Sequence, residues 1–365
     1  VVKKGAAATV LLVLVAGSVG AGDEAVVLMY HRFGDDRHPS TNIRVEQLEA
    51  QLDYLESHGF SVVPLVDVVA AIQGEGRLPD RAVAITVDDA YLSVYTVGYP
   101  LLRERGMPFT VFVAADPVDA GQKDFMTWDQ MRKMAGHGVS FANHGATHES
   151  VIDRKPGESR SDWLARVGAD IANGSRRLGE ELQPLDGLFA YPYGEYDRAT
   201  AAVIADLGIT AFGQHSGAIG PTSDLRALPR FPMAEAYAAI DEFAVKIASR
   251  PLPVAEVTPW DPVTTDRRPR VEVALAESDA RLDRLACFVG GQGEVDVEWL
   301  DPKRRFSVGP EKDLPEGRNR VNCTAPAAEG GRYYWFSHPW VVRPRPASAI
   351  SDAYSLLAAV KASPS

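Results

Sequence analysis

Residues 101–113 read LLRERGMPFTVFV, and this stretch contains the pattern that decides the fold: a helical segment, a glycine and an apolar run. The pattern recurs in three further stretches, at residues 53–65 (DYLESHGFSVVPL), 131–142 (MRKMAGHGVSFA) and 203–212 (VIADLGITAF). The glycines stand where a helix needs a left-handed residue to stop, at Gly59, Gly106, Gly138 and Gly208. The runs that follow them are rich in Val, Ile and Phe, which is typical of buried parallel strands.

Helices that alternate with such strands predict βαβ units and a sheet covered by helices. Further strands are expected at residues 24–30 (EAVVLMY), 82–87 (AVAITV) and 187–192 (GLFAYP), which gives about seven strands between residues 25 and 215. An α/β barrel and a doubly wound sheet both fit this pattern, and the number of strands does not choose between them.

The amino-acid composition of the sequence changes near residue 250. Residues 251–268 are rich in Pro, Thr and charged residues and are interpreted as a linker after a first domain at 23–250. Short alternating runs separated by Gly and Pro follow, and they predict a small all-β, sandwich-like domain at 269–345. Residues 346–365 are interpreted as a tail.

Residues 1–22 have the pattern of an export signal. Lys3 and Lys4 precede an apolar core that is short for a membrane span, and small residues follow it. The alternative is a retained membrane anchor; no other segment is expected to span a membrane. The sequence therefore predicts an exported protein, periplasmic or extracellular. In an oxidising compartment Cys287 and Cys323 would form a disulfide, and the alternative is two separate buried thiols.

The composition excludes one class of partner. The formal net charge is −11, and Lys and Arg are not clustered as a surface that follows phosphates would require, so nucleic acid is not expected as a partner. Hydrophobic residues make up 45% of the chain and charged residues 24%, as in an ordinary globular protein that buries a core.

Two histidines lie four residues apart in the stretch FANHGATH, at His144 and His148. On one helical turn, residues at this spacing share a face, and two imidazoles so placed bind one divalent metal ion. The glutamate of the His-Glu-x-x-His metalloprotease motif is missing. The alternative interpretation is a pair of solvated or capping histidines.

Two carboxylates, Asp88 and Asp89, end the apolar run AVAITVDD. Neighbours in a regular strand point to opposite faces, so both face one pocket only where the strand ends and its alternation relaxes. Ligand pockets of α/β folds form at such strand ends. The alternative is a helix N-cap with a solvated neighbour.

A third stretch, LFAYPYGEYD, also follows a predicted strand. Pro192 and Gly194 fix a turn there, and backbone N–H groups of such a turn can be aimed at a developing oxyanion. The alternative is an ordinary strand-to-helix loop.

Taken together, the segments TVDDA (86–90), HGATH (144–148) and AYPYG (190–194) resemble, in this order, the motifs of the polysaccharide deacetylase family, carbohydrate esterase family 4. The resemblance covers roughly residues 25 to 245. The segments LMYHRF and YPYGEYD look most like the exported poly-N-acetylglucosamine deacetylases of that family. The resemblance implies a distorted (β/α) barrel of about seven strands.

The resemblance also implies roles for individual residues. Asp88 would be the general base, and Asp89, His144 and His148 would bind a divalent metal, usually Zn²⁺. The backbone N–H of Tyr193 would help to hold the oxyanion. The general acid stays open between His31, in MYHRF, which is preferred, and His215, in FGQHSG.

Several positions depart from the family pattern. Val87 and Ala90 replace the usual Phe and Gly, and Gly145 stands where Ser or Thr is usual. Ala190 stands where many members have the Arg that orients the base, and the late Leu-x-His motif is replaced by LPR, which ends at Arg230.

The predicted function is a metal-dependent hydrolase that removes N-acetyl groups from a polysaccharide containing N-acetylglucosamine. The alternatives are a deacetylase of peptidoglycan, chitin oligomers or O-acetyl esters, or a glycan-binding or export-complex protein without turnover. The expected partner is the polysaccharide, without a membrane span once the signal is removed. The aromatic residues of RYYWFSHPW (332–340) indicate either a glycan-binding module or a sandwich core and domain interface.

Overall fold

The computed structural model describes residues 22–184, 187–302 and 304–344. The predicted export signal, apart from Gly22, and the predicted tail at 346–365 lie outside these residues. None of the helices within the described ranges is both long and apolar enough to cross a membrane.

A parallel sheet forms the centre of the first half of the chain. Its strand order is β10-β1-β5-β6-β7-β8-β9, and β4 pairs with β5 beside this path. The strands are β1 (Ala25–Tyr30), β4 (Ser61–Val62), β5 (Ala82–Asp88), β6 (Phe109–Val113), β7 (Ser140–Asn143), β8 (Leu188–Ala190), β9 (Thr210–Phe212) and the antiparallel β10 (Ala218–Ile219). Each of the seven strands predicted from the sequence is present.

The two ends of this sheet are joined by a single segment, which includes β11 (Phe231–Pro232). At one end, Leu228 donates its N–H to the carbonyl of Ala211 in β9 (2.7 Å). At the other end, Met233 donates its N–H to the carbonyl of Met29 in β1 (2.9 Å). The sheet therefore curls into a distorted barrel, as the resemblance implies, and the doubly wound alternative is wrong.

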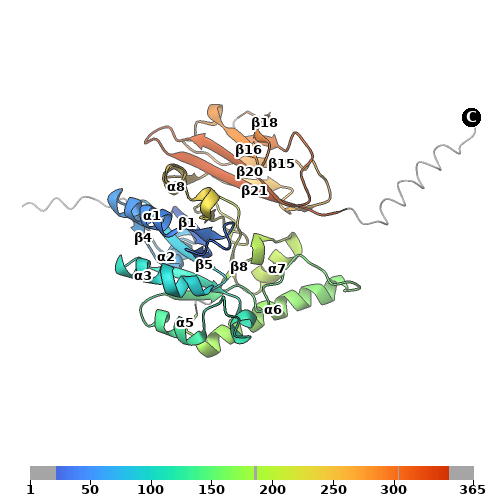
Figure 1. Cartoon of the computed structure of the whole chain (residues 1–365). Helices are drawn as coiled ribbons and strands as arrows, with labels where there is room; N and C mark the ends of the chain where they lie inside the picture. Colours follow the sequence, from blue (N-terminus) through green and yellow to red (C-terminus); the bar gives the residue numbers. More distant parts are fainter. Residues whose placement is uncertain (1–21, 185–186, 303, 345–365) are drawn as a thin grey trace, which may run out of the picture.

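Helices cover the outside of the barrel (Figure 1). They are α1 (Val45–Ser57), α2 (Leu65–Ile72), α3 (Tyr99–Glu104), α4 (Ala115–Asp119), α5 (Trp128–Ala135), α6 (Arg160–Glu181), α7 (Arg198–Asp206) and α8 (Ile240–Ile247). The four glycines predicted to stop helices have positive φ: 70°, 63°, 87° and 71° at Gly59, Gly106, Gly138 and Gly208. A small parallel pair, β2 (Arg32–Phe33) and β3 (Asn42–Ile43), follows β1.

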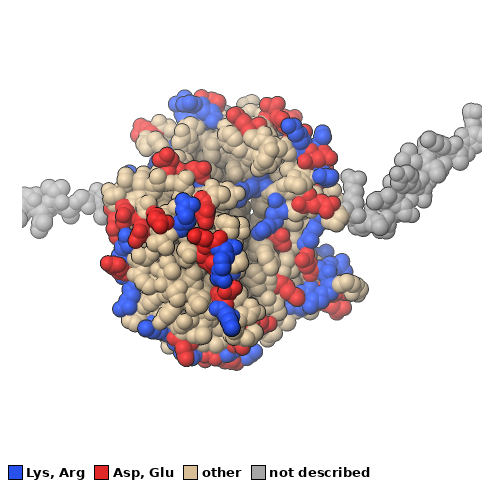
Figure 2. Space-filling view, viewed as in Figure 1, with Lys and Arg blue, Asp and Glu red and all other residues tan. Residues whose placement is uncertain are grey.

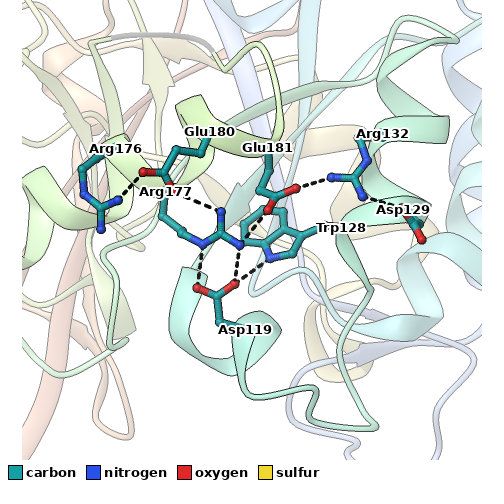
Figure 3. A network of polar contacts seen from close by, with 8 residues as sticks. All are labelled: Asp119, Trp128, Asp129, Arg132, Arg176, Arg177, Glu180 and Glu181. Carbon is teal, nitrogen blue, oxygen red and sulfur yellow. Dashed lines mark hydrogen bonds and ion pairs between the residues drawn. The ribbon is translucent and has the colours of Figure 1, made fainter.

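A charged network ties the C-terminal turn of α6 to α4 and α5 (Figure 3). Arg177 donates from Nε to Asp119 Oδ2 (2.8 Å) and pairs through Nη2 with Glu181 Oε1 (2.7 Å). Trp128 donates from Nε1 to Asp119 Oδ1 (2.7 Å), and Arg132 pairs with Glu181. The network holds in place the helix that supports a loop of the site described below.

The second half of the chain is an all-β sandwich, as predicted. One sheet has the order β13-β15-β19-β18, formed by β13 (Val254–Thr258), β15 (Val271–Leu275), β19 (Arg305–Val308) and β18 (Val297–Asp301). The other contains β12 (Arg250–Pro251), β21 (Tyr333–Val342), β20 (Gly317–Pro326), β16 (Ala286–Val289), β17 (Gly293–Val295) and β14 (Val263–Thr264). A disulfide joins Cys287 of β16 to Cys323 of β20, so the two cysteines pair.

The structure differs from the expected linker at residues 251–268. Strands β13 and β14 lie inside this range, and both pair with strands of the sandwich. Its prolines and threonines therefore belong to edge strands and turns, where a missing N–H is tolerated. We propose that the second domain begins near residue 250.

The two halves pack against each other through one face of β20 and β21 (Figure 1). Trp335 of β21 packs edge-on against Phe231 of the barrel, with ring centroids 5.1 Å apart. Val341 packs with the barrel residues Tyr191 and Tyr196. Most aromatic residues of 332–340 therefore serve the sandwich core or this interface, and Tyr333 is exposed.

Candidate active site and metal centre

The end of β5 carries two carboxylates into the same pocket. Asp88 is the last residue of the strand and is fully buried, and Asp89 and Ala90 follow it with φ of 74° and 56°. Two left-handed residues in succession break the alternation of the strand. Asp89 therefore lies beside Asp88 instead of on the opposite face of the sheet.

The two histidines of HGATH reach the site on a loop. Residues 144–148 follow β7 and are not helical, and His148 has a φ of 62°. The prediction of a shared helical face is therefore wrong, although the two rings do meet, with centroids 4.9 Å apart. Gly145, with a φ of 82°, allows the turn between them.

Residues that the sequence analysis did not identify hold this loop. Asp170 of α6 accepts hydrogen bonds from the backbone N–H groups of Ala146 (3.2 Å) and Thr147 (3.0 Å). A Cβ at Gly145 would lie 2.7 Å from Asp170 Oδ2, so the family's usual Ser or Thr does not fit this arrangement. Asn143 accepts from the N–H of Gly145 (2.7 Å). No sequence motif connects residues 145 and 170.

Three ligand atoms converge at the centre of the site. His144 Nε2 lies 3.2 Å and His148 Nε2 lies 2.9 Å from Asp89 Oδ1. His144 Nδ1 lies 2.7 Å from the carbonyl oxygen of Ala190. Because a carbonyl only accepts, His144 Nδ1 carries the proton, and its Nε2 presents a lone pair to the centre.

The three residues fit a divalent metal ion. Their ligand atoms all lie within 4.8 Å of one another, and Asp89 Oδ1 and His144 Nε2 are buried without a hydrogen-bond partner among the described residues. Two imidazole nitrogens and a carboxylate oxygen form the donor set of a catalytic zinc site with open positions. Burial raises the pKa of Asp89, but in the absence of a metal ion the protonated imidazoles of His144 and His148 outweigh it and hold that pKa well below its usual range. The carboxylate is therefore ionised, as a metal ligand must be.

Asp88 forms a buried ion pair with Arg230. The Nη1 and Nη2 atoms of Arg230 donate to the two carboxylate oxygens at 2.7 and 2.8 Å, and both side chains are fully buried. Arg230 also donates to the Gly213 carbonyl (3.0 Å) and to Thr86 Oγ1 (3.2 Å). Burial raises the pKa of Asp88, and the attraction of Arg230 outweighs it, so the pKa is lowered. Arg230 thus supplies a buried positive charge beside Asp88 in a chain that has Ala190 where many family members have an Arg.

The two candidate acids lie at different distances from this centre. His31 Nε2 is 4.0 Å from Asp88 Oδ2. Burial lowers the pKa of His31, although the two carboxylates oppose the shift. His215 lines a cavity between the two halves of the chain, and burial lowers its pKa to about 4. Both histidines line the hollow between the barrel and the sandwich, but His31 contacts Asp88 and its pKa responds to both carboxylates, while that of His215 shows no effect of either, so His31 is favoured.

The turn of AYPYG lies over the histidine loop. Tyr193 has a φ of 60°, and its ring meets that of His148 edge-on, with centroids 4.8 Å apart. A Cβ at Gly194 would lie 2.5 Å from the Cβ of Gln214, so only glycine fits. The Tyr193 carbonyl accepts a hydrogen bond of 2.8 Å from Arg318 of the sandwich.

Strained backbone is concentrated at this site. Five non-glycine residues in the described ranges have positive φ, and four of them are Asp89, Ala90, His148 and Tyr193. Such conformations cost of the order of 1–3 kcal/mol each and persist where the surrounding structure enforces them, often at functional sites. The strain marks this pocket independently of its sequence motifs.

Two hollows meet at Asp89 and His148, two of the three converging residues. One, of about 860 Å³, extends over the loop at residues 147–156, and the other, of about 750 Å³, extends between the barrel and the sandwich. Both are lined by Asp89, Tyr91, His148 and Tyr193. On the face shown in Figure 2, acidic and basic side chains are interspersed.

Comparison with known proteins agrees with the motifs. The family model described as polysaccharide deacetylase matches residues 75–212. Poly-beta-1,6-N-acetyl-D-glucosamine N-deacetylase of Escherichia coli (strain K12) is 23% identical over 295 residues, which cover 71% of this chain and 43% of that protein. YxkH of Bacillus subtilis (strain 168), also named for polysaccharide deacetylation, is 25% identical over 48% of this chain and 58% of its own length. The chain thus spans about half the length of these two relatives.

Solved structures show the same fold. IcaB from Ammonifex degensii superposes with a TM-score of 0.54 and 27% identity, over 62% of this chain and 97% of that one. The Streptococcus pyogenes deacetylase PplD, in complex with acetate, superposes with a TM-score of 0.55 and 19% identity, over 61% of this chain and 98% of that one.

Proposed function

We propose that this chain, which carries a polysaccharide deacetylase domain, is a metal-dependent N-deacetylase of a polysaccharide containing N-acetylglucosamine. The observation that carries the proposal is the convergence of Asp89, His144 and His148 beside the buried carboxylate of Asp88. The printed name of the E. coli relative, a poly-beta-1,6-N-acetyl-D-glucosamine N-deacetylase, supports this substrate class.

The reaction is the hydrolysis of an acetamide. Water adds to the carbonyl carbon, the C–N bond breaks, and acetate and a free sugar amine are released. Asp89, His144 and His148 would hold a divalent cation, for which we propose Zn²⁺, and that cation would polarise the carbonyl and lower the pKa of the attacking water.

The remaining residues move protons and hold charge. Asp88 accepts the proton of the attacking water as general base, and Arg230 keeps this carboxylate ionised and fixed in orientation. The backbone N–H of Tyr193 stabilises the developing oxyanion. His31 donates a proton to the leaving amine. His31 must be protonated to act as the acid, and its pKa is lowered. As the pH rises, activity should therefore begin to fall below neutral pH.

We also propose that the protein works outside the cytoplasm, in the periplasm or beyond. The disulfide between Cys287 and Cys323 supports an oxidising compartment. The export signal expected at residues 1–22 is part of the same proposal.

Acetate release tests the proposed function. Purified protein is assayed with β-1,6-linked N-acetylglucosamine oligomers, chitin oligomers and peptidoglycan, before and after treatment with a chelator. We expect release from the glucosamine oligomers that stops on chelation and returns with Zn²⁺. His148→Ala should abolish turnover and lower the metal content while the circular dichroism spectrum is retained. Release from peptidoglycan alone would contradict the proposed substrate, and release that resists chelation would contradict the metal.

A further inference from the structure

The face of the sandwich that meets the barrel carries two arginines beside the site. On β20, Arg318 and Arg320 point toward the barrel, while Val321 and Cys323, which follow them on the opposite face, are buried in the sandwich core. Arg318 donates to the Tyr193 carbonyl, and the guanidinium carbon of Arg320 lies 5.4 Å from the centroid of the Tyr237 ring. Both contacts cross from one half of the chain to the other.

These arginines form part of the wall of the hollow between the two halves. Its barrel side includes His31, Tyr193 and Tyr237, and its sandwich side includes Arg318, Arg320 and the turn at residues 290–291. Arg318 also lines the second hollow, on the other side of the metal centre. The open space thus continues past the centre in two directions.

The two hollows, of about 860 and 750 Å³, are large for one sugar. Each alone falls in the range of about 300–1,000 Å³ that holds a drug-sized ligand. From this space and its lining we infer that an extended glycan chain crosses the metal centre, and that the sandwich supplies subsites for sugars next to the one that loses its acetyl group. The inference rests on the proposed function and adds a dependence on chain length and a role for the second half of the chain.

The chemistry of the lining suits a neutral polyhydroxylated chain. The residues Tyr193 and Tyr237 are 43% and 42% exposed, and both line the hollow between the halves, where the exposed parts of their rings can contact sugar rings. Arg318 and Arg320 offer several N–H donors for hydroxyl and amide oxygens. In the other hollow, Glu149, Asp153 and Glu195 balance Arg154, Lys155 and Arg318, so no single sign of charge prevails.

Binding and turnover of short and long probes test this inference. The probes are a β-1,6-linked N-acetylglucosamine dimer and pentamer. Calorimetry with the chelator-treated full chain measures affinity without turnover, and acetate release from the Zn²⁺-loaded protein gives kcat and KM. The variants are Arg320→Ala, Arg318→Ala and the control Arg305→Ala, a partly exposed arginine of β19 in the other sheet of the sandwich.

We expect the pentamer to bind more tightly than the dimer. Arg320→Ala should weaken pentamer binding about fivefold to tenfold, which corresponds to the loss of one or two hydrogen bonds. The same variant should have a much smaller effect on binding of the dimer. Arg318→Ala should also lower kcat for both probes, since Arg318 fixes the Tyr193 turn. Arg305→Ala should change neither. Equal affinities for the two probes, no pentamer binding, or an Arg320→Ala effect that matches the control would overturn the inference. Length-dependent binding without acetate release would instead refute the proposed function.

Discussion

The backbone of Ala90 adopts a strained conformation that the geometry of the site requires. The residue is fully buried and has a φ of 56°, a conformation that costs an L-residue about 1–2 kcal/mol. The family has glycine at this position, and from the sequence alone the alanine would be taken as a change in packing. The structure shows that the substitution is instead a matter of backbone strain, because the turn that redirects Asp89 needs a left-handed residue here.

We therefore expect Ala90→Gly to be nearly neutral. Relief of strain offsets the lost methyl burial, about 0.8 kcal/mol, and the greater freedom of the unfolded glycine, about 0.4–1 kcal/mol. The control is Ala84→Gly, inside the regular part of β5, where no strain is relieved and a loss of about 1–2 kcal/mol is expected. Urea unfolding measures both. A similar loss for the two variants would show that Ala90 is not strained.

The ion pair between Arg230 and Asp88 is the second residue-scale feature. Arg230→Met leaves a buried carboxylate without its partner, which typically costs about 3–5 kcal/mol. The same change raises the pKa of Asp88, so the acidic limb of the activity profile should move to higher pH. The double variant Arg230→Met, Asp88→Asn removes the stranded charge. It should recover much of the stability, measured by urea unfolding, while acetate release is lost because the general base is gone. Stability that does not recover would argue against a charge effect.

Sequence reasoning identified the converging residues but not their supports. Asp88, Asp89, His144 and His148 stand in short local motifs. Arg230 lies 142 residues from Asp88 in the chain, so their pairing depends on how the barrel closes. Asp170 is one polar residue among many in an amphipathic helix, and nothing in its local sequence shows that it faces the histidine loop. A spacing of four between histidines fits a helix and a tight loop equally well, which is why the helical prediction was wrong.

At the scale of elements, helix α6 supports the metal centre through a close approach to the histidine loop. A Cβ at Gly174 would lie 2.6 Å from Asn143 Oδ1 and 2.9 Å from the carbonyl carbon of Gly145. Glycine inside a helix costs about 1 kcal/mol relative to alanine, so its presence here has a packing reason. The helix can lie this close to the loop only because residue 174 has no side chain.

Gly174→Ala should therefore push α6 from the loop. We expect lower stability and weaker binding of Zn²⁺, measured by competition with a chromogenic chelator. Gly179→Ala is the matched control, because its added Cβ would meet nothing within 4 Å on the same helix. That control should raise stability slightly through helix propensity and leave Zn²⁺ affinity unchanged. Equal Zn²⁺ affinity in the two variants would contradict the supporting role of α6.

For the whole molecule, the order of an α/β domain followed by an all-β sandwich was predicted correctly from local patterns, because βαβ units and short alternating strands are visible in consecutive residues. The closure of the sheet into a barrel was implied only by the family resemblance, since the local pattern also fitted a doubly wound sheet. The boundary was less predictable, because the Pro- and Thr-rich segment 251–268 resembles a linker in composition while β13 and β14 pair with strands far along the chain. The way in which the sandwich packs on the barrel, and so completes the hollow beside the metal centre, depends on contacts between residues distant in sequence.

The interface between the halves contains two buried histidines that are harder to protonate in the folded protein than in the unfolded chain. His215 and His338 line the same cavity, and burial lowers their pKa values to about 4 and about 3. The charge of a protonated His215 lowers the pKa of His338 further, and Arg230 and Arg320 lower the pKa of His215, against the weaker attraction of Asp224. Both rings are therefore neutral in the folded protein at pH values where they are protonated in the unfolded chain.

The lowered pKa values of the two histidines predict how stability depends on pH. An unfolded histidine titrates near 6.5, so between about pH 6.5 and 4 the unfolded chain binds more protons, and the free energy of unfolding falls as the pH falls. His338→Leu removes one of these groups and should flatten that fall, as measured by urea unfolding at several pH values. His137→Leu, at an exposed position, is the control and should keep the wild-type slope. If His338→Leu left the slope of unfolding free energy against pH unchanged, His338 at this interface would not contribute to the pH dependence of stability.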